Sequence, residues 1–336
     1  MTDQAFAVAP LPDRDSTFDS EASSASARSR AAGSPVSAAD DRRADGHTRP
    51  APQQGRMICI CVDDFGQHAD VNNAALRLAA MQRVHAIGCL VGGNAWKTWS
   101  RLLRRLDSDG IDLGLRLNFT DAPLLSRSRR APRALIAASL TGRLDRRGLR
   151  AEIRAQLDTF EQAVGHAPAF LDGHQHVHEL PGIRRLLLDE LDERYGWFRP
   201  WVRSSHSLVG LRRMPGASWW RNAAQRLVQS MSSRGLATLA RRRGYPQNRQ
   251  LLVMQQVRDG LPRYREQWDA RLRVCDTADL LSCRPTLGHD AGDPLVDARV
   301  AEFQWLSSPA FGELLLLFEV SLWPMSQILA SQGTQP

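Results

Sequence analysis

The stretch ICICVDDFG, residues 58–66, decides the fold of this chain. Its first five residues form an apolar run typical of a buried strand, and the run ends abruptly in Asp63 and Asp64. Two adjacent carboxylates repel each other when both are ionised, so the pair indicates a nearby source of positive charge. An aspartate that caps the following helix is the simpler interpretation of either residue taken alone.

Similar apolar runs recur along the chain, separated by stretches with helical periodicity. Strands that alternate with helices are typical of a parallel sheet with crossover helices, so we predict an α/β fold, a distorted TIM-like (β/α) barrel. The predicted strands are 58–62, 86–91, 112–119, 169–173, 198–204, 251–256, 280–284 and 317–322. The predicted helices are 70–83, 95–107, 148–164, 181–194, 217–239, 261–272 and 296–307.

Composition divides the 336 residues into a single barrel domain, 56–325, and two tails. Residues 1–55 are rich in Ala, Ser and Arg without apolar periodicity, which predicts a disordered tail, and residues 326–336 are expected to be a flexible tail. The first segment lacks the apolar core of a signal peptide. The five cysteines lie mostly in apolar runs and form no CxxC pair, so we predict a cytoplasmic protein with reduced thiols.

The net charge of +8 comes from arginines that are scattered through the helical patterns, so we predict no specific nucleic-acid partner. The C-terminal run ELLLLFEVSLWPMSQILA, residues 313–330, approaches the length of a membrane span. Glu319 and Pro324 interrupt it, and we predict a buried strand and helix instead. The sequence is compatible with a homo-oligomer.

The segment LDGHQHVHELP, residues 171–181, holds three of the nine histidines of the chain at alternate positions. The C-terminal ends of barrel strands meet at one face, so these histidines are expected near Asp63 and Asp64. Imidazole and carboxylate groups together suit Zn, Mn, Fe or a less typical Mg centre. Histidines that only hydrogen-bond a buried loop are the alternative.

Four ordered motifs lie across residues 57–323: VDDFG, GLRLNFTDAPL, FLDGHQHVHELPGI, and LSCRP followed by ARVAEFQWLSSPAF. They resemble the motifs of the YdjC-like carbohydrate deacetylases, which include chitooligosaccharide deacetylases and hopanoid-associated members. The resemblance implies a distorted (β/α) barrel and a divalent metal, usually Mg²⁺. It also implies an enzyme that hydrolyses the N-acetyl group of an amino sugar, a small carbohydrate substrate.

The resemblance assigns roles to several residues of this chain. Asp63 and Asp64 fall on the catalytic aspartate pair, and Asp64 with His174 falls on metal ligands. The candidates for substrate binding are Asn118, Thr120 and Asp172.

Two family histidines are replaced by Arg116 and Arg284. Arginine has no lone pair for a cation and stays protonated, so Arg116 removes a ligand and adds positive charge. His176 or His178 would have to complete the coordination of a metal.

Three functional hypotheses follow from these replacements. The first is a metal-dependent deacetylase, in which the ion polarises the amide carbonyl. The second is a catalytically impaired homologue that binds a carbohydrate or has a regulatory role, with Arg116 and Arg284 in place of the metal and paired with Asp63 and Asp64. The third keeps hydrolysis without a metal, and an arginine supplies the oxyanion contact.

Overall fold

The structure, a computed structural model, describes residues 55–107, 110–125, 131–207, 219–254, 260–288 and 293–333. The predicted tail over residues 1–55 lies outside these ranges except for Gly55, and so do residues 255–256 of the sixth predicted strand and residues 334–336. No helix within the described ranges is long and apolar enough to cross a membrane.

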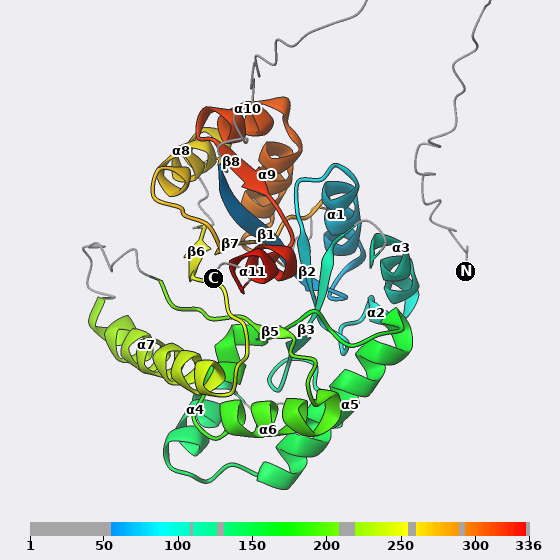
Figure 1. Ribbon diagram of the computed structural model, residues 1–336, viewed down its shortest axis with the longest axis vertical. Helices are drawn as coiled ribbons and strands as arrows, with labels where there is room; N and C mark the ends of the chain where they lie inside the picture. The colour runs from blue at the N-terminus through cyan, green and yellow to red at the C-terminus, as the bar shows by residue number, and fades with distance from the viewer. Residues whose placement is uncertain are drawn as a thin grey trace, which may run out of the picture. The chain divides into compact units, whose positions relative to one another are not determined.

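Within the described residues, eight strands form one sheet in the order β5-β4-β3-β2-β1-β7-β6, and β8 pairs with β1 (Figure 1). The strands are β1 (Arg56–Phe65), β2 (Ala86–Cys89), β3 (Asp112–Leu117), β4 (Phe170–Gly173), β5 (Trp201–Val202), β6 (Gln250–Val253), β7 (Asp279–Cys283) and β8 (Val320–Leu322). Every ladder is parallel, which confirms the predicted α/β class.

The two edges of this sheet approach each other. The Val202 amide donates to the Pro246 carbonyl at 2.9 Å, and the Leu251 amide donates to the His206 carbonyl at 2.8 Å. These two hydrogen bonds connect the segment at β5 with the segments that flank and begin β6, but they do not form a continuous β-ladder. The sheet is therefore a curled, incompletely paired barrel, which confirms the predicted distortion.

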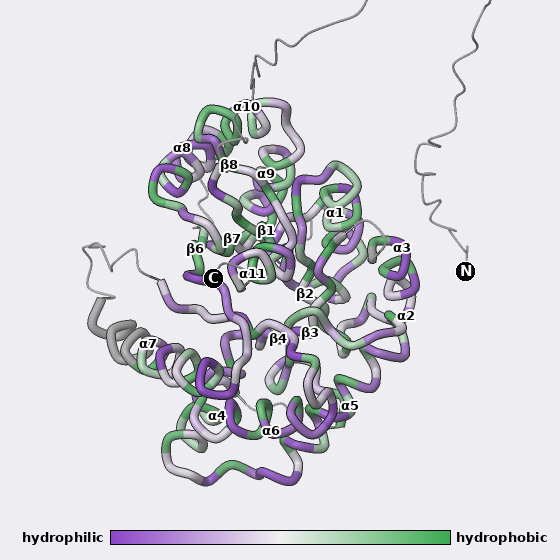
Figure 2. Tube along the Cα trace, viewed as in Figure 1, coloured by the Kyte–Doolittle hydropathy of each residue, from purple (hydrophilic) through white to green (hydrophobic). Residues whose placement is uncertain are grey.

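Helices surround the strands, and the helices carry many hydrophilic residues while the strands are mostly hydrophobic (Figure 2). The helices are α1 (Ala69–Ala80), α2 (Trp96–Trp99), η1 (Ser100–Leu102), α3 (Leu103–Asp107), α4 (Pro132–Leu140), α5 (Arg146–Val164), η2 (His174–Glu179), α6 (Ile183–Tyr195), α7 (Trp219–Arg242), α8 (Gly260–Leu272), α9 (Val296–Ser307), α10 (Pro309–Leu317) and α11 (Met325–Gly333). Helices α4 and α10 were not among the helices predicted from the sequence.

The start of the last predicted strand was wrong. Helix α10 extends to Leu317, and β8 begins only at Val320. A proline at the first turn and the Ser308 hydroxyl, which accepts from the Phe311 amide at 3.2 Å, begin this helix. The apolar leucines that follow read equally well as strand or helix, so periodicity alone did not separate the two.

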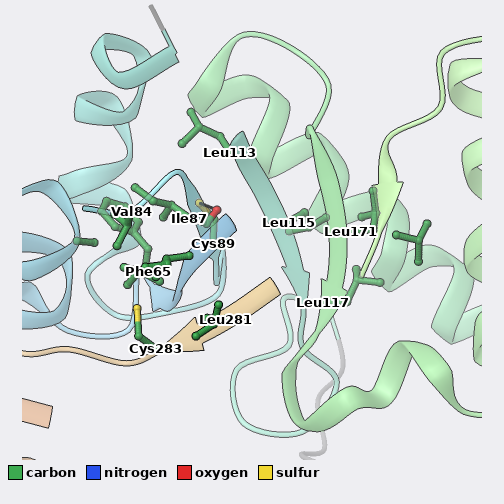
Figure 3. Close-up of a cluster of buried hydrophobic side chains, with 14 of the residues drawn as sticks. Phe65, Val84, Ile87, Cys89, Leu113, Leu115, Leu117, Leu171, Leu281 and Cys283 are labelled. Carbon is green, nitrogen blue, oxygen red and sulfur yellow. Dashed lines mark hydrogen bonds between the residues drawn. The ribbon is translucent and has the colours of Figure 1, made fainter. Parts of the chain in front are cut away.

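Alternation along the strands divides the core into an outer and an inner layer. Leu113, Leu115 and Leu117 lie on one face of β3 and pack with the apolar faces of the helices (Figure 3). The intervening positions, which include Gly114 and Arg116, lie on the opposite face. The same alternation on the other strands lines the interior of the barrel.

The interior is apolar at the N-terminal ends of the strands. Phe170 and Trp201 stack there with ring centroids 4.3 Å apart, and the buried Met325 and Ile328 of α11 pack in the same cluster. The Ser326 amide also donates to Asp112 at 2.8 Å. Residues 325–333 are therefore a packed helix, and the predicted flexible tail over 326–336 is corrected for this part.

Candidate active site

The C-terminal half of the barrel interior is charged. Asp63 and Asp64 are both buried there, although adjacent strand residues normally face opposite ways. The ladder between β1 and β2 shifts between Val62 and Phe65, and Asp64 has a left-handed backbone with φ of 69°. This β-bulge turns both carboxylates toward the interior, and aspartate is among the residues that tolerate such a conformation.

Arg116 lies among the carboxylates. It is paired in register with Asp172 of β4, and its Nη1 contacts the Asp172 carboxylate directly. Its Nε lies 3.0 Å from Asp64 Oδ1, and its Nη1 lies 3.3 Å from Asp63 Oδ2. One guanidinium thus contacts three buried carboxylates.

Arg203 is a second buried cation in this site, and the sequence reading did not single it out. It follows β5, where its amide donates to the Leu171 carbonyl at 3.0 Å. Its Nη1 lies 2.6 Å from Asp63 Oδ1 and 3.0 Å from Asp172 Oδ2. The signal was available, because Arg203 is the first polar residue after the apolar part of the fifth predicted strand.

Arg284 lies at the edge of the cluster, directly after β7. Its Nε is 3.4 Å from Asp64 Oδ2 and 3.8 Å from Asp63 Oδ2, and 39% of its side chain is exposed. Ser282 Oγ, from β7 itself, donates to Asp63 Oδ2 at 2.6 Å. Of the three arginines, Arg284 is the one that reaches solvent.

We call these six groups the ionic centre. Its members are Asp63, Asp64, Asp172, Arg116, Arg203 and Arg284. Three carboxylates face three guanidinium groups, so the formal charge of the ionic centre is balanced by its own side chains.

The guanidinium groups keep the carboxylates ionised. Burial alone would raise the pKa of Asp63, but the nearby arginines hold that pKa well below its usual range. Burial also opposes ionisation of Asp64 and Asp172, and Arg116 is the main group that lowers the pKa of each. Such carboxylates bind protons weakly, so they are poor general bases.

His174 is the histidine that contacts the ionic centre from the solvent side. Its Nδ1 lies 3.4 Å from Asp64 Oδ1, and its Nε2 lies 2.7 Å from Asp121 Oδ2. Only 14% of the His174 side chain is exposed, whereas Asp121 is 57% exposed. The sequence reading did not single out Asp121, which directly follows the predicted candidate Thr120.

The other two histidines of the cluster point elsewhere. The segment is a 3₁₀ turn with left-handed backbone at Gln175 and His176, so the three imidazoles do not share one side. His178 Nε2 lies 2.8 Å from the Arg203 carbonyl, and His178 Nδ1 lies 3.8 Å from Asp172 Oδ1. Burial lowers the pKa of His176 to about 3, so this imidazole is neutral.

The remaining predicted binding residues are buried. The Asn118 side chain accepts from the Thr120 amide at 3.0 Å and from the Asp121 amide at 2.9 Å, which fixes the turn after β3. Asp172 is fully buried within the ionic centre. In this arrangement Asn118 and Thr120 position Asp121, and Asp172 holds the two buried arginines.

An open cavity of about 570 Å³ adjoins the chain segments that leave the ionic centre. Gln67 and His68 line it a few residues after Asp64, and Thr286 lines it two residues after Arg284. Asp70, Asp293 and Arg299 add further polar groups. Such a mixed lining can hydrogen-bond a ligand that is rich in hydroxyl groups.

Comparison with known proteins identifies the family. The model of the YdjC-like protein family matches residues 57–316, which include the whole ionic centre. This chain belongs to the YdjC-like family. The resemblance seen in the four sequence motifs is thereby confirmed.

Named relatives match part of this YdjC-like chain. It is 29% identical to the carbohydrate deacetylase of Homo sapiens over 152 residues, which are 41% of this chain and 46% of that protein. It is 25% identical to the chitooligosaccharide deacetylase of an Enterobacter species over 132 residues, 38% of this chain and 52% of that protein. The matches thus span about half the length of these relatives.

A solved structure shares the fold. A candidate cellobiose-phosphate cleavage protein from Enterococcus faecalis superimposes with a TM-score of 0.57, at 15% identity, over 82% of this chain and 99% of that chain. At this identity the likeness supports the YdjC-like fold and says nothing of activity.

Proposed function

We propose that this YdjC-like protein is a hydrolase that removes an acetyl group from an acetylated carbohydrate. The observation that carries the proposal is the contact between Asp64 and His174, which come from motifs more than a hundred residues apart and lie 3.4 Å from each other at the strand ends. Family membership and the relatives named as deacetylases support it.

The residues present do not fit the divalent metal that the family resemblance implies. The Arg116 guanidinium contacts all three carboxylates at the position where an ion would need their oxygens. A dication 4 Å from a guanidinium would meet a repulsion of about 8 kcal/mol at an effective dielectric of 20. Within the part of the chain that the structure describes, no three His, Cys, Asp or Glu side chains form a group suited to a metal.

If hydrolysis uses only the side chains of this protein, His174 is the residue that transfers the proton. His174 Nδ1 faces the ionised Asp64 Oδ1 at 3.4 Å, which favours the ring proton on Nδ1, so the lone pair that can accept a proton from water is on Nε2, at the exposed edge beside Asp121. Arg284 is the exposed cation at the same edge and can donate to the acetyl carbonyl oxygen as negative charge develops there. Water adds its oxygen to the carbonyl carbon, the bond to the sugar nitrogen breaks, and that nitrogen receives the proton.

A second candidate function is carbohydrate binding without hydrolysis. The specific observation in its favour is the ionic pairing of Asp63 and Asp64, which makes both poor bases. The cavity lined by Gln67, His68 and Thr286 would still bind the ligand in this case.

One set of assays separates these functions. Purified protein is analysed for metal content and tested for acetate release from N-acetylchitooligosaccharides, with and without EDTA. We expect acetate release that persists in EDTA and falls at least 100-fold in His174→Gln. Saturable sugar binding without acetate favours the second candidate, whereas stoichiometric metal and loss of activity in EDTA would contradict both.

Two variants sharpen this comparison. Arg116→His restores an imidazole and removes the positive charge, so we expect it to gain affinity for a divalent ion. Arg273→Gln is the matched control, because Arg273 is an exposed arginine whose partner is Asp269, far from the ionic centre. Equal metal content in Arg116→His and in the control would show that Arg116 is not what excludes the ion.

A further inference from the structure

Arginines from helices α6 and α7, which are labelled in Figure 1, line a second cavity. The cavity has a volume of about 350 Å³. Its lining residues are Arg184, Arg185, Arg234, Gly235, Thr238, Leu239 and Arg242. None of them belongs to the ionic centre, and the lining contains no acidic side chain.

The neighbouring arginines show why this cavity is unusual. Arg154 lies 2.7 Å from Glu190, and Arg194 lies 2.6 Å from Glu161. Arg243, next in sequence to Arg242, lies 2.7 Å from Asp189. By contrast, among the described residues no carboxylate lies within ion-pair distance of any of the four cavity arginines. The four cavity arginines therefore bring positive charge together without a carboxylate in direct contact.

Arg184 is fixed in position at the inner wall of the cavity. Its Nη1 donates to the Glu179 carbonyl at 3.2 Å and to the Ser232 carbonyl at 3.4 Å. A Cβ atom on Gly235 would lie 2.4 Å from Arg184 Nη1, so the glycine leaves room for this guanidinium against α7. Burial first, and then the charge of Arg185, lowers the pKa of Arg184. An anion in the cavity would relieve this repulsion.

We propose that the cavity binds the phosphate group of a small ligand, either free phosphate or a phosphorylated sugar. Guanidinium groups match phosphate oxygens with paired hydrogen bonds, and a dianion compensates more of the charge than a carboxylate does. Four arginines line a single cavity, whereas the nearby Arg154, Arg194 and Arg243 are paired with carboxylates. This arrangement suits a compact anion rather than the long backbone of a nucleic acid.

The proposal does not depend on the deacetylase activity, and titration calorimetry of the full chain tests it. The probes are inorganic phosphate and glucose 6-phosphate, with glucose and chloride at equal ionic strength as references. We expect saturable binding of at least one phosphate probe and none of the references. Tighter binding of the sugar phosphate would identify the esterified source, and equal affinity would identify phosphate itself.

The variants are chosen to leave the fold intact. Arg234 and Arg242 are exposed, so Arg234→Gln with Arg242→Gln removes two charges without disturbing the core. We expect the phosphate dissociation constant to rise at least tenfold in this double variant and to stay unchanged in Arg273→Gln. The proposal is overturned if neither phosphate probe saturates, if both variants weaken binding equally, or if duplex DNA binds more tightly than either probe.

Discussion

Arg203→Met is the sharpest test of how the barrel interior is stabilised. Arg203 is buried, and its Nη1 contacts Asp63 at 2.6 Å and Asp172 at 3.0 Å. Methionine fills much of the same volume but leaves the three carboxylates of the ionic centre facing two guanidinium groups. Breaking a buried ion pair by removing one partner costs about 3–5 kcal/mol, because the remaining charge is uncompensated. We therefore expect the melting temperature to fall by roughly 6–20 °C.

Urea unfolding monitored by tryptophan fluorescence measures this loss. The control is Arg273→Gln, which removes an exposed i,i+4 ion pair and should leave the unfolding midpoint nearly unchanged. A double variant, Arg203→Met with Asp172→Asn, removes one charge of each sign and should be more stable than Arg203→Met alone. The reasoning is refuted if Arg203→Met costs no more than the control, or if the double variant is less stable than the single one.

Two further predictions concern buried groups near the ionic centre. Burial raises the pKa of Glu302 from 4.5 to about 7, although Tyr264 and the Arg284 amide donate to it. Because the pKa is higher in the folded state, Glu302 contributes stability that is fully present below about pH 4.5 and is lost as the pH rises to 7. The free energy of unfolding should therefore decline by about 3 kcal/mol over this window in the wild type, and Glu302→Gln should remove this decline. Unfolding measured as a function of pH tests this, and an unchanged slope in Glu302→Gln would contradict it. Gly114 and Gly88 are register partners on β3 and β2, but a Cβ on Gly114 would lie 2.3 Å from the Phe170 ring, whereas one on Gly88 has only ordinary contacts. Thermal melts should show Gly114→Ala destabilised by about 1–3 kcal/mol or more, and Gly88→Ala by much less; equal losses would argue against this packing.

Much of the fold could be predicted from the sequence because buried parallel strands are short, apolar and separated by helices. All eight predicted strands overlap strands of the structure, although only Trp201–Val202 of the fifth forms a ladder. The buried strand and helix predicted within residues 313–330 correspond to β8 and α11, but the tail was predicted to begin at residue 326, inside α11, since a short segment at a chain end carries little periodicity. Its burial depends on Met325 and Ile328 filling the base of the barrel, which is a tertiary effect.

The site was predictable only in part. The strand ends pointed to Asp63, Asp64 and His174, and the structure brings these together. Alternation of three histidines suggested a shared orientation, but the left-handed backbone at Gln175 and His176 separates the imidazoles. Such conformations cost energy locally and depend on surrounding packing, so a pattern of residue types does not reveal them.

The ionic centre is difficult to explain by stability alone. Replacing a buried ion network by apolar side chains of similar volume is often neutral or stabilising, so six charged groups are not needed to hold a barrel together. The charges do give the site a permanently charged edge, where His174 and Arg284 are partly exposed to solvent and contact carboxylates that remain ionised. A guanidinium cannot dissociate as a metal ion can, so this edge keeps its charge whatever ions surround the protein. Under the proposed function, carbohydrate recognition at that edge would therefore be independent of metal supply, and acetate release in the presence of EDTA is the measurement that tests this.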